Sequence, residues 1–356
     1  MPSLKEIKGR INSISSTLAI TSAMKMVAAA KLQKAQMAIQ NMLPYERRLH
    51  SMLIDLMGAM NISAAASEDG SVRGSGSAER GFDQSGDRLS LSNRHDLAGM
   101  DGAYSLMAQR EVRKVAIVAF ASNSSLCGAF NSNAIREATA VINEYRASGL
   151  GDADITVYSV GRKMAEAMKK LGFPSPADFT KMSDSPSYDA ASALAQELFD
   201  GFVSGRFDKV ELVYNHYKST SSQPTTRQTY LPLSLADATA DIQVGKITDS
   251  ASEPYADKVA EPVVRQNSPT TETPDLIVEP SKEELIATLL PKVVRLRVFT
   301  TLLDSTAAEH AARTVAMQLA TDNGNDLLQE LTLEYNKGRQ QKITSEILDL
   351  VGGSMQ

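Results

Sequence analysis

Residues 289–321 read LLPKVVRLRVFTTLLDSTAAEHAARTVAMQLAT, and one series of side chains runs through them at alternating spacings of four and three residues. The series consists of Leu289, Val293, Leu296, Thr300, Leu303, Ala307, His310, Thr314, Met317 and Thr321. This alternation is typical of the seam of a coiled coil. We therefore expect one long helix over residues 282–352, capped by Ser281 and packed along a second helix.

Two features of this expected helix are irregular. Pro291 lies in its second or third turn, where the proline ring removes a backbone hydrogen bond, so we expect a bend there. The four-three spacing slips near Asn323 and Gly324, and it resumes at Leu328. We therefore expect an interruption of the seam between these positions.

The N-terminal residues 2–60 predict a second long helix. Ser3 is a suitable cap, and Glu6 stands three residues later as its capping-box partner. The first seam positions are Leu4, Ile7, Ile11, Ile14 and Leu18. These spacings match those of the C-terminal helix, so the two helices are the natural partners of one coiled coil.

The pattern of the N-terminal helix changes after residue 18. Thr21 and Lys25 fall on seam positions, so the strict apolar spacing fails there. The stretch 24–30 consists mostly of small and flexible residues. Pro44 predicts a kink or a break, and apolar seam residues return over 49–60.

The length of the two helices argues against a compact globule. About 70 helical residues span roughly 105 Å at about 1.5 Å per residue. A compact globule of this length of chain would be about 50 Å across, from the scaling of the radius of gyration. The C-terminal helix must therefore project, and we expect the two helices to run antiparallel as a stalk.

The chemistry of the expected seam is unusual. Small or polar residues stand at successive seam positions over 300–314, where a freestanding coiled coil would carry Leu and Ile. Such a seam makes a slender rod, which suits insertion into another protein. The expected outer face is mixed, with Lys25, Lys31, Arg313, Arg339 and Lys342. The alternative is an ordinary helical hairpin that alanine and threonine weaken.

The middle of the chain alternates predicted strands with predicted helices. Strands are expected over 115–120, 155–160 and 209–215, with 228–233 as a candidate for a further strand. Helices are expected over 131–146, 162–171 and 188–203. This alternation indicates a mainly parallel sheet. The predicted fold class is α/β: a long antiparallel coiled coil of N- and C-terminal helices plus a Rossmann-like, mainly parallel α/β domain.

The sequence thus divides into five expected segments. They are an N-terminal stalk helix over 1–62, a flexible Gly/Ser-rich insertion over 63–110, the α/β domain over 111–247, a Pro-rich linker over 248–280 and a C-terminal stalk helix over 281–356. The prolines of the fourth segment favour an extended linker.

Composition narrows the possible functions. The net charge is −5, which argues against a dedicated nucleic-acid-binding protein. Basic residues cluster on the N-terminal helix, but no aromatic residues interleave with them, so a protein partner is the better interpretation. A single cysteine excludes an internal disulfide and indicates a reducing compartment. No stretch approaches the roughly 20 apolar residues that span a bilayer, and the first residues do not read as a secretory signal.

No catalytic motif is evident. There is no Gly-x-x-x-x-Gly-Lys-[Ser/Thr] loop for nucleotide phosphates and no Gly-x-Gly-x-x-Gly after the first strand. Cys127 follows that strand, where an α/β fold places ligands, but a phosphatase-like Cys-x5-Arg would need arginine where Asn133 stands. We expect a buried structural cysteine. An α/β enzyme with a helical arm that uses Cys127 is the alternative.

Metal and cofactor sites are not indicated either. The four histidines, His50, His95, His216 and His310, are scattered, and no pair has metal-ligand spacing. His310 on the C-terminal seam is interpreted as a packing or hydrogen-bonding residue. We expect no catalytic residue, no metal and no cofactor.

Three stretches of the two long helices resemble a known family. Residues 20–32, ITSAMKMVAAAKL, resemble its N-terminal signature. Residues 309–324, EHAARTVAMQLATDNG, and 333–347, LEYNKGRQQKITSEI, resemble its C-terminal one. The family is the gamma subunit of bacterial F-type ATP synthases. The α/β part is similar more loosely, through LCGAFN at 126–131 and SQP at 222–224.

The resemblance implies a rotor without chemistry of its own. The stalk would insert into a hexamer of alternating alpha and beta subunits, and the α/β domain would form a foot that meets the epsilon subunit and the ring of c subunits. Rotation would couple proton flow to ATP synthesis or hydrolysis by driving the catalytic sites of the hexamer through successive states. The resemblance also implies a peripheral position on the cytoplasmic face of the bacterial inner membrane.

The resemblance further assigns contacts with the alpha/beta hexamer, which would be mechanical and electrostatic. The matching positions are Met24, Lys25, Arg313, Arg339, Gln340, Thr344 and Glu346. Arg339 and Gln340 match residues that meet loops of the beta subunits, and Arg313 matches a position linked to coupling. The alternative for the charged residues is a solvated helix surface.

The sequence departs from the family's pattern in three places. Residues 121–127 read ASNSSLC, where relatives commonly have Asp-Arg-Gly before Leu-Cys. The segments 63–110 and 250–273 are longer than usual. We hypothesise that these segments contact the stator, the epsilon subunit or the c ring, or limit reverse rotation. A coiled-coil adaptor without a motor role is the alternative function.

Overall fold

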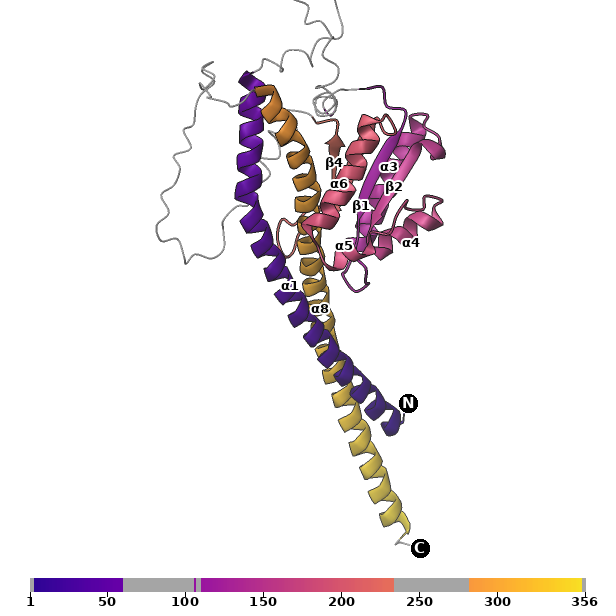
Figure 1. Ribbon diagram of the computed structural model, residues 1–356. Helices are drawn as coiled ribbons and strands as arrows, with labels where there is room; N and C mark the ends of the chain where they lie inside the picture. The colour runs from indigo at the N-terminus through magenta and orange to yellow at the C-terminus, as the bar shows by residue number, and fades with distance from the viewer. Residues whose placement is uncertain (1–2, 60–105, 107–109, 234–281, 354–356) are drawn as a thin grey trace, which may run out of the picture.

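The computed structural model describes residues 3–59, 106, 110–233 and 282–353. Within these residues, two long helices run side by side next to a four-stranded α/β body (Figure 1). The expected insertion, apart from residues 106 and 110, and the expected Pro-rich linker lie outside the described residues.

The two long helices form an antiparallel pair. Helix α1 covers Leu4–Ala59 and helix α8 covers Lys282–Gly353. With 72 residues, α8 is roughly 108 Å long. Its C-terminal part extends past the N-terminus of α1, away from the α/β body (Figure 1). The projecting antiparallel stalk that the sequence predicts is confirmed.

The helix start and the prolines follow from local chemistry. The backbone N–H of Glu6 donates to Oγ of Ser3 at 3.2 Å, which confirms the expected cap of α1. Pro44 lies inside α1 without ending it, so the helix does not break there. Pro291 lies inside α8, and Figure 1 shows α8 curving over its first turns.

The seam keeps its register through α1, where the sequence pattern predicted a failure after residue 18. Oγ1 of Thr321 donates to Oγ1 of Thr21 at 3.1 Å. Nζ of Lys25 donates to Oε1 of Gln318 at 2.7 Å. The predicted placement of Thr21 and Lys25 on seam positions is confirmed. The apolar spacing fails there, but the seam continues, because hydrogen bonds between polar side chains occupy the positions that apolar side chains would otherwise fill.

The seam also continues through α8, where the sequence pattern predicted a slip. Gly324 faces Leu18 so closely that a Cβ at Gly324 would lie 2.6 Å from Cδ2 of the leucine. Gly338 meets Leu4 in the same way, with a Cβ distance of 3.1 Å. The predicted slip is wrong, because a missing side chain on one helix makes room for a leucine on the other.

The α/β body holds one sheet in the strand order β2-β1-β3-β4. The strands are β1 (Val115–Phe120), β2 (Ile155–Val160), β3 (Lys209–Asn215) and β4 (Thr225–Leu231). The first three are parallel and β4 is antiparallel to β3, which confirms the expected mainly parallel sheet. The first three have the predicted bounds. Strand β4 was predicted over 228–233, but it begins before residue 228 and ends before residue 233.

Helices cover both faces of the sheet. Helices α3 (Phe130–Ala147) and α4 (Arg162–Lys170) pack on one face, and α6 (Tyr188–Val203) and α8 pack on the other. Because both faces of β1 are covered, its unbroken apolar run needs no polar alternation. The sequence did not predict the short helices α5 (Thr180–Asp184) and η2 (Asp152–Asp154).

One hydrophobic core joins the body to one end of the stalk. Leu49 and Leu53 of α1 and Ile286 and Leu290 of α8 are buried in the same cluster as Phe202 of α6. The stalk is therefore fixed in the body at this end, and its other end projects (Figure 1). Among the described helices, none combines the length and the apolar character that crossing a membrane requires.

Candidate functional site: the stalk tip and the joints between stalk and body

The tip of α8 extends beyond the end of the helical pair. Gly338 lies opposite Leu4, in the first turn of α1, and α8 continues from there to residue 353. Four residues that the resemblance singled out are exposed on this tip: Arg339, Gln340, Thr344 and Glu346. Apolar residues between 48% and 74% exposed accompany them: Ile343, Ile347, Leu348, Leu350 and Val351. Such an exposed apolar patch indicates a surface that another protein covers.

Met24 and Lys25 lie half-buried on α1, with Met24 beside a cavity and Lys25 at the seam. Lys25 therefore does not lie on the outer face, where the sequence placed it. Met24, Lys31 and His310 line the cavity, which has a volume of about 310 Å³. Burial, together with the charges of Lys31 and Arg313, lowers the pKa of His310 to about 4. The imidazole is therefore neutral at neutral pH.

Arg313 points into the body instead of away from the stalk. Its side chain is 10% exposed. Nη1 donates to the carbonyl oxygen of Ser125 at 2.7 Å, and Nη2 donates to Oγ of Ser124 at 2.8 Å and to Oε1 of Glu309 at 2.7 Å. Placing Arg313 on the outer face was wrong, because the loop after β1 and a neighbouring carboxylate satisfy the guanidinium. Burial raises the pKa of Glu309, even though the adjacent guanidinium favours the carboxylate.

The loop after β1 is closed by its own hydrogen bonds and packs against α8. The backbone N–H of Ser122 donates to Oδ1 of Asn131 at 2.9 Å, and Nδ2 of Asn131 donates to Sγ of Cys127 at 3.2 Å. Cys127 is 1% exposed and packs with Phe130 and with Ala308 of α8, so its predicted burial is confirmed. The carboxyl ends of parallel strands bind ligands in many α/β folds, and here they contact the stalk.

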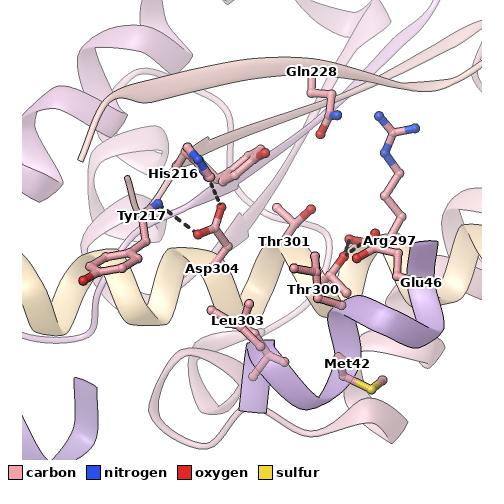
Figure 2. A pocket seen from close by; sticks show the side chains of 13 residues that line it. Met42, Glu46, His216, Tyr217, Gln228, Arg297, Thr300, Thr301, Leu303 and Asp304 are labelled. Carbon is pink, nitrogen blue, oxygen red and sulfur yellow. Dashed lines mark hydrogen bonds and ion pairs between the residues drawn. The ribbon is translucent and has the colours of Figure 1, made fainter. Parts of the chain in front are cut away.

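A second joint between stalk and body lies nearer to the shared core, beside a cavity of about 160 Å³ (Figure 2). Nδ1 of His216, just after β3, lies 2.6 Å from Oδ2 of Asp304 on α8. This hydrogen bond raises the pKa of His216, although burial opposes it. Met42 of α1 and Gln228 of β4 also line the cavity. In the described part of the chain, no three His, Cys, Asp or Glu residues are grouped as metal ligands would be.

Comparison with known proteins identifies the family. A family model described as ATP synthase matches residues 3–355. The ATP synthase gamma chain of Phocaeicola vulgatus is 48% identical over 355 residues, with 100% of both chains covered. That of Bacteroides thetaiotaomicron is 45% identical over 356 residues, again with 100% of both covered. The chain belongs to the ATP synthase gamma-chain family. The resemblance that the terminal signatures indicated is confirmed.

A solved structure agrees with this family's fold. A chain of the Euglena gracilis mitochondrial ATP synthase, in an assembly described as OSCP/F1/c-ring in rotational state 3, has a TM-score of 0.52 and 18% identity. The match covers 99% of this chain and 93% of that chain. At this identity the likeness shows the fold, which is the long helical pair with an α/β body.

In this member of the gamma-chain family, the sequence did not predict the two joints between the stalk and the α/β body. Asp304 and Tyr217 belong to no motif, and Glu309 begins the signature stretch 309–324 without having been assigned a role. One signal was available: Asp304 and Glu309 interrupt a stretch of α8 in which apolar, alanine and threonine residues prevail. Acidic residues in such surroundings need partners, because an unpaired buried carboxylate is costly.

Proposed function

We propose that this chain is the central-stalk rotor of an F-type ATP synthase. In this role it couples proton flow across a membrane to ATP synthesis or hydrolysis and performs no chemistry of its own. The observation that carries the proposal is the exposed tip of α8, which projects from a rod of roughly 108 Å in a member of the gamma-chain family. A rod fixed in a body at one end can transmit rotation to whatever surrounds the other end.

The proposed partners differ at the two ends of the rod. Alpha and beta subunits form a hexamer around the tip, while the epsilon subunit and the c-subunit ring meet the α/β body. The Euglena chain comes from an assembly described as OSCP, F1 and c-ring, which supports this arrangement. The relatives named above are bacterial, which supports a peripheral position on the cytoplasmic face of the bacterial inner membrane.

The proposed contacts with the hexamer fall into three groups. The exposed group at the tip consists of Arg339, Gln340, Thr344 and Glu346. Met24 and Lys25 form the second group, on the half-buried edge of the seam. Arg313 makes up the third group and is proposed to serve coupling from inside, through the loop that it holds against α8.

The test is purification of the tagged chain from its own membranes, with ATPase activity assayed on the eluate. We expect alpha, beta and epsilon subunits to co-elute with ATPase activity. A variant that lacks residues 339–356 should lose the hexamer or its coupled activity, because the exposed tip is gone. If the full-length chain elutes without these subunits and without ATPase activity, the adaptor alternative replaces the rotor.

A further inference from the structure

Two residues just after β3 lie in the angle between the stalk helices. The strand ends at Asn215, and His216 and Tyr217 follow. Figure 2 shows both residues beside α8, and dashed lines join each of them to Asp304. This segment therefore links β3, an inner strand of the sheet, directly to α8 of the stalk.

The contacts of this segment with α8 centre on one carboxylate. The backbone N–H of Tyr217 donates to Oδ1 of Asp304 at 2.9 Å, and Nδ1 of His216 lies 2.6 Å from Oδ2. The two oxygens of one side chain thus hold two successive residues. The tyrosine also packs against the cluster that contains Ala307 and Ala311 of α8.

The same tyrosine reaches the other stalk helix. Nε2 of Gln36 on α1 donates to Oη of Tyr217 at 2.7 Å. Leu32 and Ala35 of α1 belong to the same cluster as Ala307, against which the tyrosine packs. The small side chains on both helices leave space for the ring, which gives the small-residue seam a structural reason at this level of the stalk.

Tyr217 also packs against the body itself. Cys127 and Phe130, in the loop after β1 and at the start of α3, form a cluster with Ala308 that the tyrosine contacts. One half-buried side chain therefore contacts α1, α8 and the loop of the body at once. By comparison, Arg313 and the loop after β1 join the body to α8.

We propose that Tyr217 is a positioning residue that fastens the α/β body to both helices of the stalk, so that torque passes between the body and α1 as well as α8. The proposal rests on the proposed rotor function. Twisting the helical pair relative to the body would have to break the bond from Gln36 and the bonds to Asp304. The shared core around Leu49 and Ile286 is another attachment, so fastening at Tyr217 shortens the length of stalk that is free to twist.

The experiment compares variants in the assembled enzyme. Membrane vesicles provide two rates, ATP hydrolysis and ATP-driven proton pumping, and hydrogen–deuterium exchange on the purified complex reports the amides of residues 30–40. The variants are Tyr217→Ala, Tyr217→Phe, Gln36→Leu and the double variant of the last two. Tyr45→Ala is the matched control, because this α1 tyrosine is 54% exposed.

We expect Tyr217→Ala to retain ATPase activity but to lower proton pumping per ATP by about twofold to 30-fold, the range that substitutions in coupling networks produce. Its amides over 30–40 should exchange faster, and the Tyr45→Ala control should match the wild type. Tyr217→Phe and Gln36→Leu should each have a smaller effect. The double variant should have no larger effect than either single variant, because both substitutions remove the same hydrogen bond between Gln36 and Tyr217.

Different results would overturn the fastening role of Tyr217 and the rotor function. Wild-type pumping and wild-type exchange in Tyr217→Ala would overturn the proposal. If that variant does not assemble, Tyr217→Phe and Gln36→Leu decide: faster exchange over 30–40 supports the fastening, and unchanged exchange overturns it. If wild-type vesicles show no ATP-driven pumping, the rotor function itself fails, while exchange over residues 30–40 in the purified complex still decides whether Tyr217 fastens α1.

Discussion

Replacement of Arg313 by leucine tests the joint between α8 and the loop after β1. The variant loses the hydrogen bonds to Ser125 and Ser124 and leaves the carboxylate of Glu309 without its partner. The two side chains of the pair are 10% and 9% exposed, so the loss is that of a buried pair. Removing one member of a buried pair costs about 3–5 kcal/mol, and we expect about 3 kcal/mol at neutral pH.

Cys127 provides the assay, because it is the single cysteine of the chain and lies buried in the loop that Arg313 holds. A thiol reagent reaches it when the loop opens. About 3 kcal/mol corresponds to a roughly 100-fold faster labelling rate, since about 1.4 kcal/mol is tenfold. Each rate is divided by the rate of the urea-unfolded chain at the same pH, which removes the intrinsic ionisation of the thiol.

The size of the effect depends on pH with a defined sign. Burial already raises the pKa of Glu309 in the folded chain above its ordinary value of 4.5. Loss of Arg313 raises this pKa further, so the penalty of a buried charge is present above the raised pKa. The penalty disappears as the pH falls towards 4.5, where the carboxyl is protonated in the unfolded chain too. The ratio of variant to wild-type labelling should therefore be larger at pH 8 than at pH 5.

Two further variants separate charge from hydrogen bonding. Adding Glu309→Gln to Arg313→Leu should recover about half of the loss, because no unpaired charge remains. Arg313→Lys should lie between wild type and leucine, since an ammonium cannot reproduce the forked contacts of a guanidinium. Labelling of Arg313→Leu within threefold of the wild type at pH 8 would refute the reasoning, because the guanidinium would then not close the loop.

Three more predictions follow from the described contacts. Gly161→Ala should destabilise the body by at least about 2 kcal/mol in thermal melts, because a Cβ there would clash with the carbonyl oxygen of Ala121 at a φ of +95°; an unchanged melting temperature would contradict this. The pair of His216 with Asp304 stabilises the wild type below about pH 6.5, and this stability is lost as the pH rises through the raised pKa of His216. His216→Gln lacks the pair, so its urea midpoint should lie below that of the wild type at pH 6 and close to it at pH 8.5. Deletion of residues 343–356 should leave the melting temperature of the isolated chain unchanged, since these side chains are exposed where they are described, and a large drop would show that they pack within the chain.

The elements of the fold could be read from the sequence because their signals are local. The four-three spacing over 289–321 predicted α8, and the apolar runs of β1, β2 and β3 predicted strands with the observed bounds. The family could be read as well, because its signatures are continuous stretches of the two long helices. The outer-face position expected for Arg339 agrees with the exposure of this residue on the tip.

Register and the joints required the tertiary structure. The spacing rule looks for apolar residues, so it could not recognise that Gly324 receives Leu18 or that Lys25 bonds with Gln318 across the seam. These pairs are complementary only when both helices are in place. A sequence pattern evaluates each helix by itself and therefore predicted interruptions where the seam is continuous.

The sequence by itself determined two long helices, a mainly parallel sheet and membership of the gamma-chain family. The tertiary structure alone decided that Arg313 turns inward and that Tyr217 joins Gln36 to Asp304. The physical reason is sequence separation. Periodicity reports neighbours three or four residues apart, whereas these contacts link residues more than 80 positions apart. Such contacts exist only after the body has packed against both helices of the stalk.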